Sequence, residues 1–110
     1  MSNCIFCKII NQKIPADLIY KSKSFIVIKD LYPKAKIHLL IIPKKHMVFD
    51  DLTENQAQII AESFQIAKKI TKMLKIKNGF RLVINNGKNS GQEIEHLHIH
   101  YLAGQKLSFS

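Results

Sequence analysis

The sequence contains no tryptophan, only two cysteines and only eight acidic residues, against 17 lysines and arginines. Both cysteines lie in one C-x-x-C segment, Cys4 to Cys7, which is too little for a disulfide framework and raises metal binding or redox chemistry instead. No apolar run approaches the ~20 residues that cross a bilayer, and the first residues do not read as a signal peptide. We therefore expect a cytoplasmic protein with no membrane partner.

The length of 110 residues and the apolar share of 46% fit one folded domain, expected over residues 1–110. The formal charge of +9 favours an anionic partner without naming it. The lysines are dispersed, Arg81 is the only arginine, and no nucleic-acid-binding motif accompanies them. A specific nucleic-acid partner is therefore not expected.

The hydrophobic pattern predicts a mostly antiparallel α+β fold with five strands, one short helix and one long helix. Residues 53–76 form the clearest helix, with a capping box of Thr53 and Gln56 before it and Asn78-Gly79 as its stop. The short helix is expected at residues 4–10. Strands are expected at residues 18–21, 25–29, 38–42, 80–85 and 96–102.

Three histidines alternate with apolar residues near the end of the chain. On a strand, His96, His98 and His100 would share one face, since successive side chains point to opposite sides. Such a row suits nucleophilic and proton-transfer chemistry, whereas a solvated strand or an incidental metal-binding tract would explain it equally well. His38, at the start of a central apolar strand, would by itself be read as a core residue.

With these histidines in place, the sequence closely resembles the histidine triad (HIT) family. The resemblance covers nearly the whole chain and includes the pattern in which histidine alternates with apolar residues from His96 to Leu102. The other matching segments are 5–10, 14–16, Asp30, 38–46, 85–87 and 91–92.

The resemblance is to the small Hint-type branch, whose members hydrolyse nucleoside phosphoramidates. It implies a homodimer in which two five-stranded sheets form one sheet of ten strands. It also implies that His98 attacks the α-phosphorus and forms a nucleotidyl-histidine intermediate, while His100 and His38 contact the phosphate and leaving group. One imidazolium would balance the charge of the phosphate oxygens, and water would release the nucleoside monophosphate.

The loop 86–92 is polar and contains glycine, so its N–H groups can face an anion, although a plain connecting turn has the same composition. By resemblance, Asn85 and Gln92 contact phosphate and Asp30 holds the ribose hydroxyls. The base pocket would be lined by Phe6, Ile28 and Leu31, which are also the residue types of an ordinary core.

Glu93 departs from the family pattern, because Hint-type proteins usually carry serine or threonine after Gly91-Gln92. A carboxylate beside a phosphate is repulsive unless it is protonated or turned outward. The departure bears on the leaving group and on the rate of the reaction.

Cys4 and Cys7 have the spacing of zinc ligands, yet two ligands do not complete a tetrahedral site. Resemblance supplies His46 and His96 as the other two. A structural zinc would then tie the first helix to the central strand and to the histidine strand. A redox pair and two inert thiols are the alternatives.

The sequence thus predicts a zinc-containing hydrolase that acts on a purine nucleoside phosphoramidate or related nucleotide through His98. One alternative is a hydrolase of dinucleoside polyphosphates such as Ap4A or Ap3A. The other is a nucleotide-binding or interaction module in which Glu93 has weakened catalysis.

Overall fold

The computed structural model describes residues 3–108 and confirms the predicted α+β class. Its regular elements are α1 (Ile5–Ile10), β1 (Leu18–Lys21), β2 (Phe25–Lys29), β3 (Ile37–Pro43), α2 (Gln58–Met73), β4 (Phe80–Val83) and β5 (Ile99–Ala103). Two short 3-10 turns, Phe49–Asp51 and Lys88–Ser90, lie in the connections. In these described residues no helix has the length and apolarity needed to cross a membrane.

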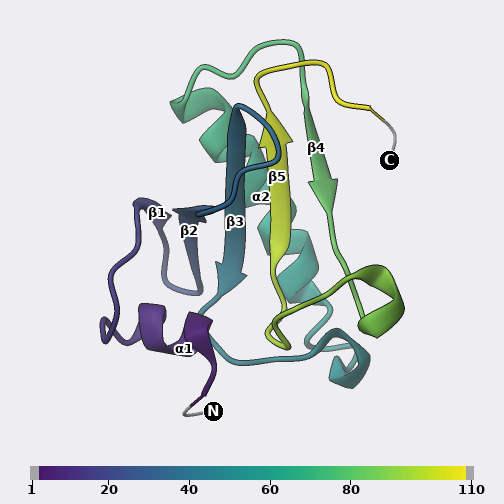
Figure 1. Ribbon diagram of the computed structural model, residues 1–110. Helices are drawn as coiled ribbons and strands as arrows, with labels where there is room; N and C mark the ends of the chain where they lie inside the picture. The colour runs from purple at the N-terminus through teal and green to yellow at the C-terminus, as the bar shows by residue number, and fades with distance from the viewer. Residues whose placement is uncertain (1–2, 109–110) are drawn as a thin grey trace.

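The five strands form one antiparallel sheet in the order β1-β2-β3-β5-β4 (Figure 1). β3 lies at its centre and consists of almost uninterrupted apolar residues, as a strand with side chains buried on both faces requires. Because side chains alternate along a strand, Leu39 and Ile41 point to one face while His38 and Leu40 point to the other. The sheet therefore separates a mainly apolar layer from a layer that contains histidine.

The apolar layer is covered by α2, which runs along the back of β3 and β5 in Figure 1. Its stripe of Ile66, Ala67 and Ile70 is buried against the sheet. Thr71 donates a hydrogen bond to the carbonyl of Ala67 (2.7 Å), and its oxygen lies 2.6 Å from the hydroxyl of Tyr101. The polar atoms of that fully buried tyrosine are thereby satisfied.

The opposite face carries a smaller core under α1, made of Phe6, Ile26, Ile28, Leu40 and Ile42. α1 covers only one end of this face. His38 and His100 lie farther along it, on neighbouring strands, where His38 pairs with Leu102 and Leu40 pairs with His100. The arrangement places histidine side chains on the side of the sheet that α2 leaves open.

The long helix is shorter than predicted at its N-terminal end. The capping box forms, since the amide of Gln56 donates to Thr53 Oγ1 (3.3 Å) and the amide of Thr53 donates to Gln56 Oε1 (3.2 Å). The hydrogen bonds that follow span three residues, from Ile59 to Gln56 and from Ile60 to Ala57. This tighter turn delays the regular α-helix to Gln58.

The predicted stop at Asn78-Gly79 is also wrong, because α2 ends at Met73. Lys75 adopts a left-handed conformation (φ 55°), Ile76 N–H donates to Thr71 O and Lys75 N–H donates to Lys72 O. This is a Schellman ending without glycine. Asn78 and Gly79, both with positive φ, form the turn into β4 instead.

The histidine strand begins later than the predicted residue 96. β5 starts at Ile99, where pairing with Ile41 begins, so His96 and His98 precede the regular strand. The pairing of β4 with β5 likewise stops at Val83 opposite His100, which ends β4 two residues before the predicted position. α1 begins one residue later than predicted, and β3 extends one residue beyond the prediction at each end.

Candidate functional site

Three histidines from β3, β5 and the segment before β5 meet on the open face of the sheet. His38 comes from β3, His100 from β5 and His98 from the segment just before β5. The ring centroids of His98 and His100 are 5.0 Å apart, and those of His38 and His100 are 5.1 Å apart. His38 and His98 are buried, whereas His100 is half-buried. The structure thus brings together the three residues predicted as catalytic.

Hydrogen bonds fix where two of these rings carry their protons. The backbone N–H of Lys34 donates to His38 Nδ1 (3.0 Å), so the proton of a neutral His38 lies on Nε2. His38 Nε2 is 2.9 Å from His100 Nδ1, which must therefore accept. The proton of His100 is left on Nε2. The two hydrogen bonds therefore run in one direction, from the N–H of Lys34 to His38 and from His38 to His100.

His98 has the opposite tautomer. Its Nδ1 is 2.7 Å from the carbonyl oxygen of His96, which can only accept, so Nδ1 carries the proton. The lone pair of His98 is therefore on Nε2. The Phe6 ring packs edge-on against His98 with 5.0 Å between centroids and limits the rotation of the imidazole. A neutral ring with a free Nε2 is the form in which histidine acts as a nucleophile.

Burial lowers the pKa of His38 and of His98 below the ordinary value for histidine. The pKa of His100 falls to about 4, because burial acts together with the neighbouring imidazoles of His98 and His38. All three rings are therefore neutral at pH 7 in the free protein. The imidazolium that the family resemblance implies has to form when a negatively charged ligand enters.

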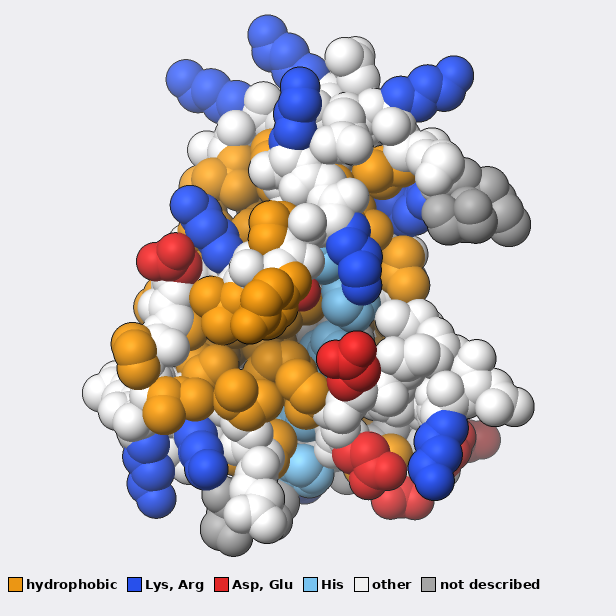
Figure 2. Space-filling model, in the orientation of Figure 1, with side chains coloured by type: hydrophobic (Ala, Val, Ile, Leu, Met, Phe, Trp, Pro, Cys, Tyr) orange, Lys and Arg blue, Asp and Glu red, His pale blue; other side chains and the backbone are white. Residues whose placement is uncertain are grey.

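A cleft of about 460 Å³ opens onto His98 and His100. Figure 2 shows histidine surface at a hollow between a group of hydrophobic side chains and polar surface. His38, which was also expected to contact the phosphate, does not line this cleft, whereas the seven residues predicted as substrate contacts outside the triad do. These residues are Asp30, Asn85, Gln92, Phe6, Ile28, Leu31 and Glu93.

The three residues expected in the base pocket differ in burial. Phe6 and Ile28 are almost fully buried and also belong to the small core under α1. Leu31 is 83% exposed, as is its neighbour Tyr32. Two such exposed apolar side chains beside a cleft leave an apolar surface that a flat ligand can cover.

Asp30 is held by its own turn and faces the triad. Its Oδ1 accepts the backbone N–H of Tyr32 (2.8 Å), and its Oδ2 lies 3.4 Å from His38 Nε2. The negative charge of Asp30 opposes the lowering of the His38, His98 and His100 pKa values. The expected contact with ribose is thus accompanied by a contact with the triad.

Gln92, expected to contact phosphate, uses its side chain inside the loop. Its Oε1 accepts the N–H of Gly87 (2.8 Å), and its Nε2 donates to the carbonyl of Ile94 (3.0 Å). Gly87 and Gly91 both have positive φ, which residues with a Cβ adopt at a cost. Gln92 therefore closes the loop that borders the cleft, while Asn85 lines the cleft directly.

Sequence reasoning missed Lys34, which also lines the cleft. Its positive charge contributes to the lowered pKa values of His38 and His100. The sequence hinted at a role for Lys34 only through its position shortly before His38, and a lysine in a turn is usually solvated.

The four predicted metal ligands form a second cluster at the end of the sheet near α1. Their ligand atoms all lie within 4.8 Å of one another. Cys4 Sγ is 3.3 Å and Cys7 Sγ 3.6 Å from His96 Nδ1, and Cys7 Sγ is 3.4 Å from His46 Nδ1. In a tetrahedral zinc site, bonds of about 2.3 Å to sulfur and about 2.0 Å to nitrogen separate such atoms by about 3.5 Å.

The surroundings of this cluster suit a metal as well. His96 Nε2 is 2.9 Å from the carbonyl oxygen of Pro43, so the proton lies there and the Nδ1 lone pair faces the thiols. The N–H of Cys7 donates to Cys4 Sγ (3.4 Å). Both cysteines are free thiols. The residues present therefore fit a Cys2His2 zinc site.

Asp30, His38 and His100 are also close enough together to hold a metal ion. The hydrogen bond from Lys34 to His38 Nδ1 leaves a proton, not a lone pair, on the nitrogen that faces the other two residues. The geometry of this second group therefore favours proton transfer over metal binding.

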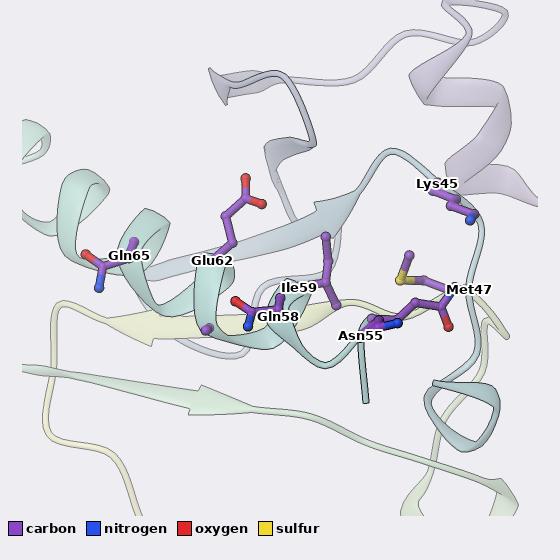
Figure 3. A pocket seen from close by; sticks show the side chains of 9 residues that line it. Lys45, Met47, Asn55, Gln58, Ile59, Glu62 and Gln65 are labelled. Carbon is purple, nitrogen blue, oxygen red and sulfur yellow. The ribbon is translucent and has the colours of Figure 1, made fainter. Parts of the chain in front are cut away.

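Another hollow, of about 480 Å³, lies beside the start of α2. Figure 3 shows Gln58, Glu62 and Gln65 along one side of the helix, with Lys45 and Met47 from the chain after β3. Its described lining residues include no histidine or cysteine. The hollow therefore lacks the neighbouring imidazoles that characterise the first cleft.

The HIT domain family model matches residues 11–107. An uncharacterized HIT-like protein of Chlamydia trachomatis is 43% identical over 104 residues, which cover 94% of this chain and 94% of that protein. A histidine triad protein of Clostridium difficile is 38% identical, with a TM-score of 0.96 over 100% of this chain and 97% of the other.

A second solved structure is described as a Zn-bound histidine triad family protein from Mycobacterium smegmatis. It is 32% identical, has a TM-score of 0.81 and is matched over 98% of this chain and 81% of its own. The family model covers most of the chain, and these relatives agree with it in sequence and structure. This chain therefore belongs to the HIT family.

Proposed function

We propose that this protein is a Hint-type nucleotide hydrolase that acts as one domain and releases a nucleoside monophosphate from a purine nucleoside phosphoramidate. The observation that carries the proposal is the tautomer of His98. Its Nε2 has a free lone pair at the cleft, and His100, with its proton on Nε2, lies beside it. The pair supplies a nucleophile and a proton donor in one pocket.

The reaction needs one proton more than the neutral triad holds. An anionic phosphate beside His38 and His100 favours the protonated form of this pair. His98 Nε2 then forms a bond to the α-phosphorus, the P–N bond breaks, and the pair gives its proton to the leaving nitrogen. Water next attacks phosphorus and returns a proton to the pair as the bond to His98 breaks. The net change is phosphoramidate plus water to monophosphate plus amine.

Different residues of the cleft would contact the base, the ribose and the phosphate of the substrate. Phe6, Ile28 and Leu31 form the apolar end and suit a purine ring, with Asp30 between them and the triad for the ribose hydroxyls. Asn85 and Gln92 line the same cleft as the histidines and would contact the phosphate group there.

The test is hydrolysis of adenosine 5′-phosphoramidate, followed by the release of AMP. His98→Asn should remove the covalent adduct and lower kcat by at least about a thousandfold, since the reaction loses its nucleophile. Lys72→Asn, a change on the exposed face of α2 outside the cleft, should keep the adduct. Unchanged turnover in His98→Asn would overturn the mechanism.

A dinucleoside polyphosphate is the second candidate substrate, because Lys29 and Lys34 both line the cleft and suit additional phosphate groups. Faster cleavage of Ap4A or Ap3A than of the phosphoramidate would favour it. Tight binding of AMP without turnover of either class would identify a non-catalytic nucleotide-binding module.

We propose that the Cys2His2 cluster of Cys4, Cys7, His46 and His96 binds a structural zinc ion. The match between its ligand distances and a tetrahedral site supports this, as does the Zn-bound relative. Reduced thiols of this kind persist in a reducing compartment such as the cytoplasm. Metal analysis of the purified protein should find close to one zinc per chain, and a value far below that would exclude the site.

We also propose a homodimer that pairs the two β4 strands. β4 is an edge strand with one neighbour, and Phe80 at its start is 40% exposed. An open edge with apolar side chains is a ready surface for pairing with another strand. Sedimentation equilibrium should give twice the chain mass at micromolar concentration, and a monomer at all concentrations would refute the pairing.

A further inference from the structure

Two charged side chains of the cleft act on the catalytic histidines. Apart from histidine, the charged residues that line the cleft are Asp17, Lys29, Asp30, Lys34 and Glu93. Of these, Asp30 raises and Lys34 lowers the pKa of both His38 and His100. Lys34 is therefore the lysine of the cleft whose positive charge reaches the triad.

Backbone hydrogen bonds hold Lys34 beside His38. The N–H of Lys34 donates to His38 Nδ1 (3.0 Å), and the N–H of Asp30 donates to the carbonyl oxygen of His38 (3.0 Å). Two residues after Lys34, the N–H of Lys36 donates to Gln105 Oε1 (2.8 Å). The turn that carries Lys34 is thus fastened to the strand that carries His38, and the lysine side chain enters the cleft from a defined place.

The ammonium group of Lys34 is free to bind a ligand. Its side chain is exposed and lines the same cleft as His98 and His100. Within residues 3–108 no carboxylate forms an ion pair with it. Figure 2 shows surface of lysine or arginine directly beside the histidine surface at the hollow. A lysine on a flexible stem, with three N–H donors, can follow an anion that binds next to the histidines.

The charges of the site call for a cation at this place. The three imidazoles are neutral at pH 7, and the carboxylate of Asp30 lies 3.4 Å from His38 Nε2. Without Lys34, a phosphate group at the triad would therefore meet a net negative charge. The ammonium group offsets that charge at short range, where Coulomb interactions are strongest.

We propose that the ammonium group of Lys34 binds the non-bridging oxygens of the phosphate that His98 attacks, and so supplies the permanent positive charge of the reaction site. The inference rests on the proposed nucleotide hydrolase function, and it applies to each candidate substrate, since each contains this phosphate. No bond to Lys34 forms or breaks. His38 and His100 keep the role of proton donor, while Lys34 stabilises negative charge on the phosphate oxygens during the attack.

The test compares the binding of AMP with that of adenosine, which lacks the phosphate. In Lys34→Gln, the Kd for AMP measured by calorimetry at low salt should rise about tenfold, as for the loss of one charged hydrogen bond. The Kd for adenosine should not change. Lys34→Arg should restore most of the affinity for AMP. Both substitutions keep the backbone N–H that binds His38, so the tautomers of the triad stay the same.

Lys36→Gln is the matched control, because Lys36 is an exposed lysine of the same turn but does not line the cleft. Its Kd for AMP should equal that of the unmodified protein. The kcat/KM for adenosine 5′-phosphoramidate should fall at least about tenfold in Lys34→Gln and stay unchanged in Lys36→Gln.

The outcomes separate the two proposals. An unchanged Kd for AMP in Lys34→Gln, an equal rise of the Kd for adenosine, or an equal rise in Lys36→Gln would overturn the role of Lys34, whether or not the protein turns over nucleotides. Binding of AMP that depends on Lys34, without turnover of any phosphoramidate or dinucleoside polyphosphate, would support that role and overturn the hydrolase. Absence of AMP binding to the unmodified protein would overturn both.

Discussion

At the scale of single residues, three backbone groups determine the chemistry of the histidines. The amide of Lys34 and the carbonyls of His96 and Pro43 each bind one ring nitrogen and so select a tautomer. A side-chain partner could be exchanged by mutation, whereas these partners depend on the path of the chain. The correct tautomers therefore follow from the fold itself.

Gln92 illustrates how one side chain organises the cleft. Gln92→Ala removes its hydrogen bonds to Gly87 and Ile94, each worth about 1 kcal/mol. We expect a loss of about 1–2 kcal/mol in the free energy of unfolding, measured by urea denaturation, together with a higher KM. Gln65→Ala, an exposed glutamine on α2 outside the cleft, is the control and should change neither. An unaffected KM in Gln92→Ala would show that the loop does not position the substrate.

At the scale of elements, the segment that carries His98 is held by contacts other than sheet pairing. Leu97 N–H donates to the carbonyl of Met47 (2.7 Å), and His96 is bound to the cysteine cluster and to Pro43. The chain at Met47 also follows directly on His46, a further member of that cluster. Three segments thus converge at the Cys2His2 cluster: α1 with the residue before it, the chain after β3 and the segment just before β5.

Removal of the two proposed zinc ligands Cys4 and Cys7 should loosen this junction. In the double variant Cys4→Ser, Cys7→Ser we expect the melting temperature of the zinc-loaded protein to fall by about 10 °C, since ligand binding to the folded state is lost. A chelator should lower the melting temperature of the unmodified protein by a similar amount. It should have no further effect on the double variant, and equal melting temperatures throughout would rule out a structural metal.

The same elements show what the sequence could and could not predict. The burial of the central strand β3 follows from its continuous apolar run, and the existence of the long helix follows from its local periodicity; both were predicted correctly. The start of β5 depends on where pairing with Ile41 begins, and the end of α2 on a lysine in a left-handed conformation. Neither is encoded in a local pattern, so both boundaries were placed wrongly.

The site was predictable to a similar degree. All seven residues expected at the substrate lie around one cleft, and the triad and the cysteine cluster each converge. Resemblance to the family supplied these positions, because residues such as Asp30 and Asn85 have no distinctive local pattern. The tautomers and the internal hydrogen bonds of Gln92 depend on three-dimensional contacts that no spacing encodes.

At the scale of the whole molecule, burial of neutral histidines links stability to pH. His38 and His100 have pKa values below their ordinary value of 6.5, and that of His100 falls to about 4. Between these limits the unfolded chain binds more protons than the folded one. The free energy of unfolding should therefore be highest above pH 6.5 and decrease as the pH drops toward 4.

Urea denaturation at pH 7.5 and pH 5 measures this effect. His100→Asn removes one of the groups concerned, so its stability should decrease less between the two pH values than that of the unmodified protein. Lys72→Asn, on the exposed face of α2, should show the unmodified pH dependence. An equal decrease in all three proteins would contradict the assignment to His100.

The carbonyl of His96 has a consequence for how this protein would be classified from kinetics. Substitution of the His96 side chain leaves that carbonyl in the chain, yet it removes the ring contacts with Cys4 and with the Pro43 carbonyl that help to hold this segment at His98. A titration of activity against free zinc would then resemble that of a metalloenzyme. The ion would nevertheless touch no reacting atom, and its contribution to the rate would be the direction in which one imidazole points.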